Sequence, residues 1–141
     1  MKRYIRSAVG NINDEDFEVQ REIAVTTDDV ENILQLYKNR NNHSDVARNP
    51  NTPVEILREL ARETPASNNG YSTSVFDSLA CNPNSPSDVL SEISHKCDWH
   101  TLGIIMKHPN VSYATLKLIS KSDKVSKDTR KLAKEIMRNK I

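Results

Sequence analysis

Residues 95–100 hold the densest group of chemically reactive side chains in the sequence. His95, Cys97 and His100 are of the types that bind zinc, but closed zinc sites use four such ligands in a regular pairing. No Cys-x-x-Cys pair accompanies them, so we predict no metal and no cofactor. The segment is interpreted as a loop between helices, in which Trp99 packs against a neighbouring helix. Trp99 and His100 are also candidates for contacting a partner.

The sequence carries no pattern that is typical of a catalytic site. It lacks the Gly-x-Ser-x-Gly turn of serine hydrolases, a glycine-rich phosphate loop and a His-x-x-x-His pair. Asp and Glu are plentiful, yet they fall at expected helix starts or on expected exposed faces. We therefore predict that the protein is not an enzyme.

The charges of the chain are divided unevenly along its length. Residues 1–106 carry 10 Lys and Arg against 16 Asp and Glu, whereas residues 107–141 carry 10 against 3. The basic end could contact phosphates, or it could be a solvated capping helix whose cations suit the helix dipole. The candidates for nucleic-acid binding are Lys124, Lys127, Arg130, Lys131, Lys134 and Arg138.

A polar stretch at 64–73 is the longest interruption between the apolar segments, and we predict a loop. Long loops in compact domains often carry function. Asn68, Asn69 and Tyr71 are therefore candidates for partner binding. The alternative is a tolerated insertion, and the sequence leaves both readings open.

Two similar phrases organise the chain: VARNPNTP at 46–53 and LACNPNSP at 79–86. Weaker copies begin at 105 and at 23. Apolar residues at helical spacing follow each phrase and predict one buried stripe per helix. Such short units cannot bury a stripe alone, so they must stack. The predicted stripe residues are Ile56, Leu57, Leu60, Val89, Leu90, Ile93, Leu116 and Ile119.

Each phrase predicts a tight corner between two helices. Asn49 and Asn82 would end the first helix in the left-handed conformation that asparagine tolerates. Thr52 would cap the next helix, with Pro53 at its first position and Glu55 completing a capping box. The equivalent caps would be Ser85, Ser112 and Asp29.

At these residues the chain resembles the variant leucine-rich repeat, a bacterial helical repeat with the pattern VA-x-NP-x-TP-x-x-x-L-x-x-LA, to which HEAT-like repeats are similar. The resemblance implies a short 3-10-like helix and an α-helix per repeat, stacked in a right-handed superhelix. The uneven copy starts depart from the regular period of that family. The two cysteines are too few for the iron–sulfur cluster that accompanies such repeats in one family setting. The matching residues are Val46, Ala47, Asn49, Pro50, Thr52, Pro53, Leu57, Leu60, Ala61, Ala80, Asn82, Pro83, Pro86, Leu90, Pro109, Leu116 and Ile119.

We therefore expect an all-α protein, a small right-handed α-solenoid of about four irregular helical repeats with terminal caps. Each repeat would pair a short or 3-10 helix with an α-helix. The expected parts are an N-terminal cap or arm at 1–22, the solenoid at 23–121 and a basic C-terminal capping helix at 122–141. The inner face of that last helix would be Leu132, Ala133, Ile136 and Met137.

The chain has no apolar run near the eighteen or so residues of a membrane helix, no secretory signal and too few cysteines for a disulfide framework. We therefore expect a cytoplasmic protein that does not bind a membrane. Our hypothesis is a non-catalytic protein–protein interaction module, such as a small phage or mobile-element inhibitor of a host enzyme. The alternative is a nucleic-acid-binding helical repeat protein that uses the basic C-terminal face.

Overall fold

Helices make up all the regular structure in the computed structural model, which describes residues 17–67 and 69–140. No strand occurs among these residues, so the all-α prediction is confirmed for them. The elements are α1 (Phe17–Thr26), α2 (Val30–Tyr37), the 3-10 helix η3 (Arg40–Asn42), α3 (His43–Arg48), α4 (Val54–Glu63), α5 (Gly70–Cys81), α6 (Ser87–Ser94), α7 (Trp99–Met106), α8 (Tyr113–Ser120) and α9 (Lys127–Lys140).

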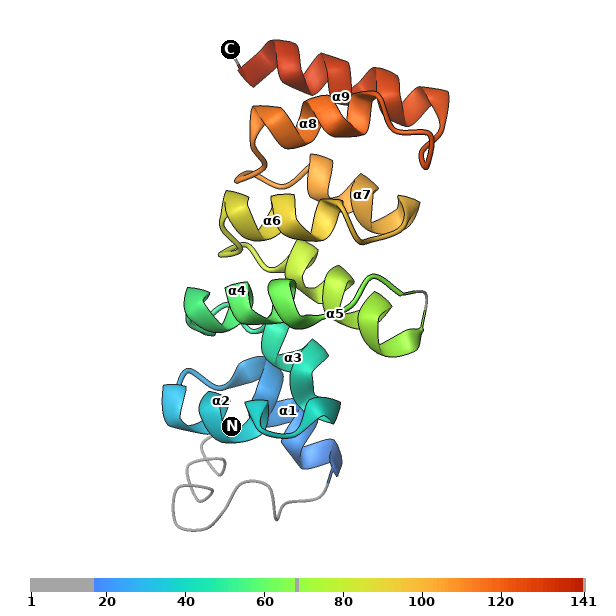
Figure 1. Cartoon of the computed structure of the whole chain (residues 1–141). Coiled ribbons are helices and arrows are strands. Elements are labelled where there is room, and N and C mark those ends of the chain that lie inside the picture. Colours follow the sequence, from blue (N-terminus) through green and yellow to red (C-terminus); the bar gives the residue numbers. More distant parts are fainter. Residues whose placement is uncertain (1–16, 68, 141) are drawn as a thin grey trace.

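The helices follow one another along one long axis, from α1 and α2 at one end to α9 at the other (Figure 1). In one row α1 packs on α3, α3 on α5 and α5 on α7. In a second row α4 packs on α6, and α6 on α8. The last helix, α9, lies along α8 and closes the C-terminal end.

The core is a strip of apolar side chains between the two rows. All eight stripe residues predicted from the sequence are buried, and Phe76 is the largest fully buried side chain. Burying one such side chain contributes about 1.5–3 kcal/mol. Because each helix adds only a few of them, the helices are stable only when packed on their neighbours.

The helix starts agree in part with the sequence. The caps predicted at Asp29 and Ser112 are confirmed, because each side chain accepts a hydrogen bond from a backbone N–H in the first turn of the following helix. Asn69 and Asp98 cap α5 and α7 in the same way. The helices α4 and α6 begin directly after the second proline of their phrases, as expected.

The hydroxyl groups of the two phrases have a different role from the predicted one. Thr52 does not cap α4; its hydroxyl donates to the carbonyl of Val46 at 2.6 Å. Ser85 makes the same bond to Leu79, also at 2.6 Å. No side-chain cap bond forms at α4, so the prediction of a capping box with Glu55 is wrong. The hydroxyls instead satisfy a carbonyl at the end of the preceding helix.

The asparagines of the phrases form hydrogen bonds between successive corners. Asn49 and Asn82 are fully buried and extended, with φ of −72° and −73°, so the left-handed prediction is wrong. The Asn82 Nδ2 donates to the carbonyls of Ala47 and Asn49 at 2.8 and 3.0 Å, and its Oδ1 accepts the Asn84 N–H at 2.9 Å. Asn49 donates likewise to two carbonyls of the preceding unit. His108 Nε2 lies 2.8 Å from the Asn82 carbonyl, and we call Asn49, Asn82 and His108 the corner ladder.

The helix that precedes a corner is the shorter one at the 49–53 corner, where α3 has 6 residues and α4 has 10, as predicted. At the next two corners the prediction is wrong. α5 has 12 residues and the following α6 has 8, while α7 and α8 have 8 each. The only 3-10 helix among the described residues is η3. The predicted loop at 64–73 is also too long, because Asn69 caps a helix that begins at Gly70.

The predicted boundaries at the two ends have different outcomes. The boundary between residues 22 and 23 falls inside α1, which spans both. Residues 1–16 lie outside the described part of the chain, so the prediction of an N-terminal arm is not tested there. The predicted C-terminal helix is present as α9, and its Ala133 is fully buried.

Candidate binding groove

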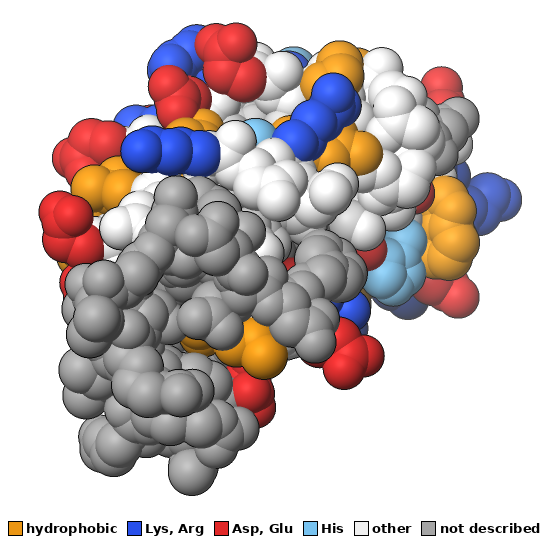
Figure 2. Space-filling view, turned by 90° about the horizontal axis from the view of Figure 1, so that it is seen from below, with side chains coloured by type: hydrophobic (Ala, Val, Ile, Leu, Met, Phe, Trp, Pro, Cys, Tyr) orange, Lys and Arg blue, Asp and Glu red, His pale blue; other side chains and the backbone are white. Residues whose placement is uncertain are grey.

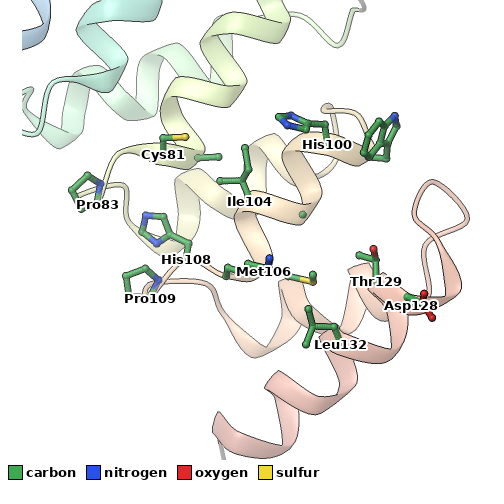
Figure 3. A pocket seen from close by; sticks show the side chains of 14 residues that line it. Cys81, Pro83, His100, Ile104, Met106, His108, Pro109, Asp128, Thr129 and Leu132 are labelled. Carbon is green, nitrogen blue, oxygen red and sulfur yellow. The ribbon is translucent and has the colours of Figure 1, made fainter.

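An apolar groove of about 700 Å³ lies between the end of α5, α7 and α9, and it is open to solvent along one side (Figure 3). Two large apolar side chains stand exposed in it, because Trp99 is 64% exposed and Leu132 is 36% exposed. Exposed apolar patches on soluble proteins often mark interaction sites. The residues that line it include Cys81, Trp99, Gly103, Ile104, Met106 and Leu132.

The way in which α9 packs on α8 explains the groove. Ala133 is fully buried, and Ile136 and Met137 are partly buried against the core. Leu132 lies one residue from Ala133 and therefore about 100° around the helix. It leaves the packed face and lines the groove, so its predicted place on the inner face is wrong.

The outward face of α7 differs from the equivalent faces of α3 and α5. The position of Ile104 corresponds to Ser78 and Asp45 when the sequence copies are aligned. Ser78 Oγ lies 2.8 Å from Ser44 Oγ, and Asp45 accepts a hydrogen bond from Arg21 at 3.1 Å. Polar bonds therefore connect α1, α3 and α5 on this side, whereas α7 presents an aliphatic side chain to the groove.

Charged side chains lie at the two ends of the groove. Lys107 follows the last residue of α7, whereas Asp128 lies in the first turn of α9. Asp77 lies near the Asp128 end, with Oδ1 3.6 Å from His100 Nδ1 and 2.5 Å from the Thr101 hydroxyl that donates to it. Figure 3 places His100 and Asp128 on one side of the view and the corner prolines on the other. One end of the groove is thus acidic and the other basic.

The reactive side chains of 95–100 do not come together. His95 Nδ1 lies 2.9 Å from the Ser91 carbonyl, and Cys97 is buried. Burial raises the pKa of the Cys97 thiol to about 12, so it is protonated at neutral pH. Within 17–67 and 69–140, no three His, Cys, Asp or Glu side chains are placed to hold a metal ion. Trp99 begins α7 and is exposed, so its predicted packing in a loop is wrong.

Two of the six predicted phosphate-binding residues make internal bonds. Lys124 Nζ donates to the Cys97 carbonyl at 3.1 Å, and Arg130 donates to the carbonyls of Ser122 and Val125 at 2.9 and 2.7 Å. The other four are exposed on α9. Their spacing of four, three and four residues places them in one stripe along the helix. This basic stripe consists of Lys127, Lys131, Lys134 and Arg138.

The candidates at 68–71 are held by the helical framework. Asn68 lies outside the described residues. Asn69 Oδ1 accepts a backbone N–H of α5 at 2.8 Å. The Tyr71 hydroxyl lies 2.6 Å from His43 Nδ1, and the Arg40 guanidinium lies 3.9 Å from the centre of its ring. Tyr71 is therefore part of an internal cluster and does not extend from a free loop tip.

This Tyr–His cluster, which comprises Tyr37, Arg40, His43, Glu59 and Tyr71, was not expected from the sequence. His43 Nε2 lies 2.8 Å from the Tyr37 carbonyl, so Nε2 carries the proton and Nδ1 accepts from Tyr71. Burial lowers the pKa of His43, which favours this neutral form. Burial and the hydrogen bond to Glu59, at 2.5 Å, raise the pKa of Tyr37. These residues are separated along the chain, so no local pattern indicates the cluster.

Known protein families, curated proteins and solved structures were compared with the chain, and none matches. Among the described helices, none is both long enough and apolar enough to cross a membrane. Function is therefore inferred from the groove and from the charged side chains.

Proposed function

We propose that the protein is a non-catalytic helical repeat module, built as a small right-handed α-solenoid, that binds another protein through the apolar groove. The observation that carries this proposal is the pair of exposed apolar side chains, Trp99 and Leu132, which line the groove together with Gly103 and Ile104. Tryptophan is enriched among the residues that contribute most to binding. Water contacts this apolar surface in the free protein, and a partner would release it.

The resemblance to the variant leucine-rich repeat stays a prediction and is part of this proposal. It is supported by the corner ladder, in which Asn49 and Asn82 each donate to two carbonyls of the preceding unit, including those of the equivalent residues Ala24 and Ala47. Polar contacts such as these hold successive helix pairs at a fixed spacing. The hypothesis of a phage or mobile-element inhibitor of a host enzyme also stays a prediction, as does a cytoplasmic location.

A pair of charge variants on α9 tests the groove. Leu132→Glu places a carboxylate in it, whereas Lys134→Glu changes a residue about 200° away around the same helix. Tagged wild-type protein and both variants would be incubated with a lysate of cells that produce the protein naturally. We expect a stoichiometric protein partner with the wild type and with Lys134→Glu, and at least ten-fold less of it with Leu132→Glu.

Circular dichroism and thermal unfolding of all three proteins are the control for folding. Leu132 and Lys134 are both exposed, so we expect little change in stability. Retention of the partner by folded Leu132→Glu would show that another surface binds it. Capture of no partner by the wild type would count against protein binding itself.

The basic stripe supports a second candidate function, which is nucleic-acid binding. Its four exposed cations lie along about 16 Å of helix and could contact one phosphate backbone. The net charge of −6 on residues 1–106 opposes this function. Figure 2, seen from the end formed by α1 and α2, shows acidic side chains interspersed with Lys and Arg.

Fluorescence anisotropy with duplex DNA tests the second candidate. If four phosphates are contacted, affinity should fall about 100-fold between 50 and 200 mM salt. Lys134→Glu should weaken binding more than Leu132→Glu, because it removes a cation of the stripe as well as adding a carboxylate. Absence of binding at 50 mM salt would exclude this function.

A further inference from the structure

The groove has the length of a short helix. α7 has 8 residues and lines one side of it, which corresponds to about 12 Å, or two turns. Gly103 also lines the groove, and a Cβ placed there would have no atom within 4 Å. A partner can therefore approach the backbone of α7 closely at this point.

The arrangement of the rows also favours a helical occupant. α1 packs on α3, α3 on α5 and α5 on α7, whereas α9 packs mainly along α8 and contacts α7 less. A helix in the groove would contact both α7 and α9 and would continue the side-by-side packing of that row. Among the described residues there is no strand, so an extended peptide would have no sheet edge to join.

The opposite charges at the two ends of the groove restrict the charges that a bound ligand can carry. Lys107 at one end attracts a carboxylate, and Asp128 at the other attracts a cation. Asp77, which is partly buried beside His100, adds to the acidic character of the second end. A uniformly charged ligand would be repelled at one of the two ends.

We propose that the groove binds an amphipathic helix of about two turns whose apolar stripe is flanked by an acidic side chain near Lys107 and a basic side chain near Asp128. The apolar stripe, at positions i, i+3 or i+4 and i+7, packs on Trp99, Ile104 and Leu132. This inference rests on the protein-binding function proposed above and adds the form and charge order of the bound segment.

The test is a selection of phage-displayed, randomised 14-residue peptides against three full-length proteins: wild type, Lys107→Glu and Asp128→Lys. Wild type should enrich peptides with an apolar helical stripe flanked by one acid and one base. Lys107→Glu should enrich peptides with bases on both sides of the stripe, and Asp128→Lys peptides with acids on both sides. This design holds whichever way the helix runs.

Two cysteines provide an independent measure of where a selected peptide binds. Cys81 is exposed in the groove, whereas Cys97 is buried and is the internal control. A synthetic peptide selected on wild type should slow maleimide labelling of Cys81 at least ten-fold. Gly103→Leu, which fills part of the groove without a clash at Cβ, should remain folded and lose the peptide.

Three outcomes would overturn the inference. Enriched peptides could be extended or proline-rich, the enriched charges could be the same for all three proteins, or Cys81 could stay reactive in the complex. Protection of Cys81 in the protein alone at high concentration, with a dimer in sedimentation, would instead show a second copy in the groove. Leu132→Glu could lose the natural partner while the selection enriches non-helical peptides. That combination would reject the bound helix but keep the protein-binding function.

Discussion

The corner ladder and the groove use their side chains in opposite ways. Asn82 is fully buried and bonds to the backbone of the preceding corner, and its counterpart Asn49 does the same. Ile104 in the groove corresponds to Ser78 and Asp45 in two of the other copies, and Trp99 is exposed. Recurring residues of this chain therefore either form the core, as Leu57 and Leu90 do, or satisfy the backbone, as Asn49 and Asn82 do. Those that differ on the open face are the ones available for binding.

The largest effect should come from removing one ladder amide. Asn82→Ala removes the side-chain donor from the carbonyls of Ala47 and Asn49 and the acceptor from the Asn84 N–H. Of these groups, only the Asn49 carbonyl keeps another partner among the described residues, the Thr52 N–H. We therefore expect a loss of about 3–5 kcal/mol in the free energy of unfolding. Asn84→Ala is the matched control, because its exposed side chain makes one bond to the Pro50 carbonyl, and it should cost less than about 1 kcal/mol. Urea unfolding measures both. Equal losses would mean that the ladder does not hold the corners.

A pair of leucines compares the core with the groove. Leu90 is fully buried, so Leu90→Ala should lower the free energy of unfolding by about 2–5 kcal/mol. Leu132 is 36% exposed, and Leu132→Ala should lower it by less than about 1 kcal/mol. Thermal unfolding of both variants checks this. A loss at Leu132 as large as that at Leu90 would place Leu132 in the core and remove it from the groove.

A glycine in the groove should be replaceable with a gain in stability. Gly103 lies within α7 and has no atom within 4 Å of an added Cβ. Because glycine is a poor helix former, Gly103→Ala should raise the free energy of unfolding by about 0.5–1 kcal/mol. Gly70→Ala at the start of α5 is the control and should give a smaller change. A destabilised Gly103→Ala would indicate that the groove is closed in solution.

The smallest effect should be a change in the pH dependence of stability. Burial lowers the pKa of His43 in the folded protein, so the unfolded chain takes up a proton first as the pH falls through about 6.5. The His43 contribution is therefore present at pH 8 and is lost on acidification. His43→Gln removes it, so the difference in stability between wild type and variant should shrink from pH 8 to pH 5.

Urea unfolding at several pH values measures this difference. His95→Gln, at an exposed site outside the Tyr–His cluster, controls for general histidine titration. A difference between wild type and His43→Gln that stays constant with pH would show that His43 is not held neutral in the fold.

The helices and their buried faces could be predicted because they depend on local order in the sequence. The spacing of Leu57 and Leu60, and of Leu90 and Ile93, is enough to define a stripe. The hydrogen-bond partner of a polar side chain in a corner could not be predicted. Thr52 fits a capping pattern, yet its hydroxyl donates to the Val46 carbonyl in the last turn of α3, which also accepts the Asn49 N–H at 3.2 Å.

Only some of the residues that line the groove could be predicted from the sequence. The chemistry of Trp99 and His100 makes them candidates, and both line the groove. The spacing of Leu132 from Ile136 and Met137 is also that of a packed face, so the sequence predicts it on the inner face of the helix. Its place depends on how α9 is turned against α8, where Ala133, Ile136 and Met137 pack against the core and Leu132 lines the groove.

By itself the sequence determined that the chain is helical, where α4, α6 and α8 begin, and which of their side chains are buried, since periodicity and proline act within a few residues. The tertiary structure decided which polar groups bond to each other, such as Tyr71 to His43. It also brought α7 and α9 together to form the groove. The reason is that these contacts depend on how the helices are placed relative to one another. That placement is set by the packing of many side chains at once.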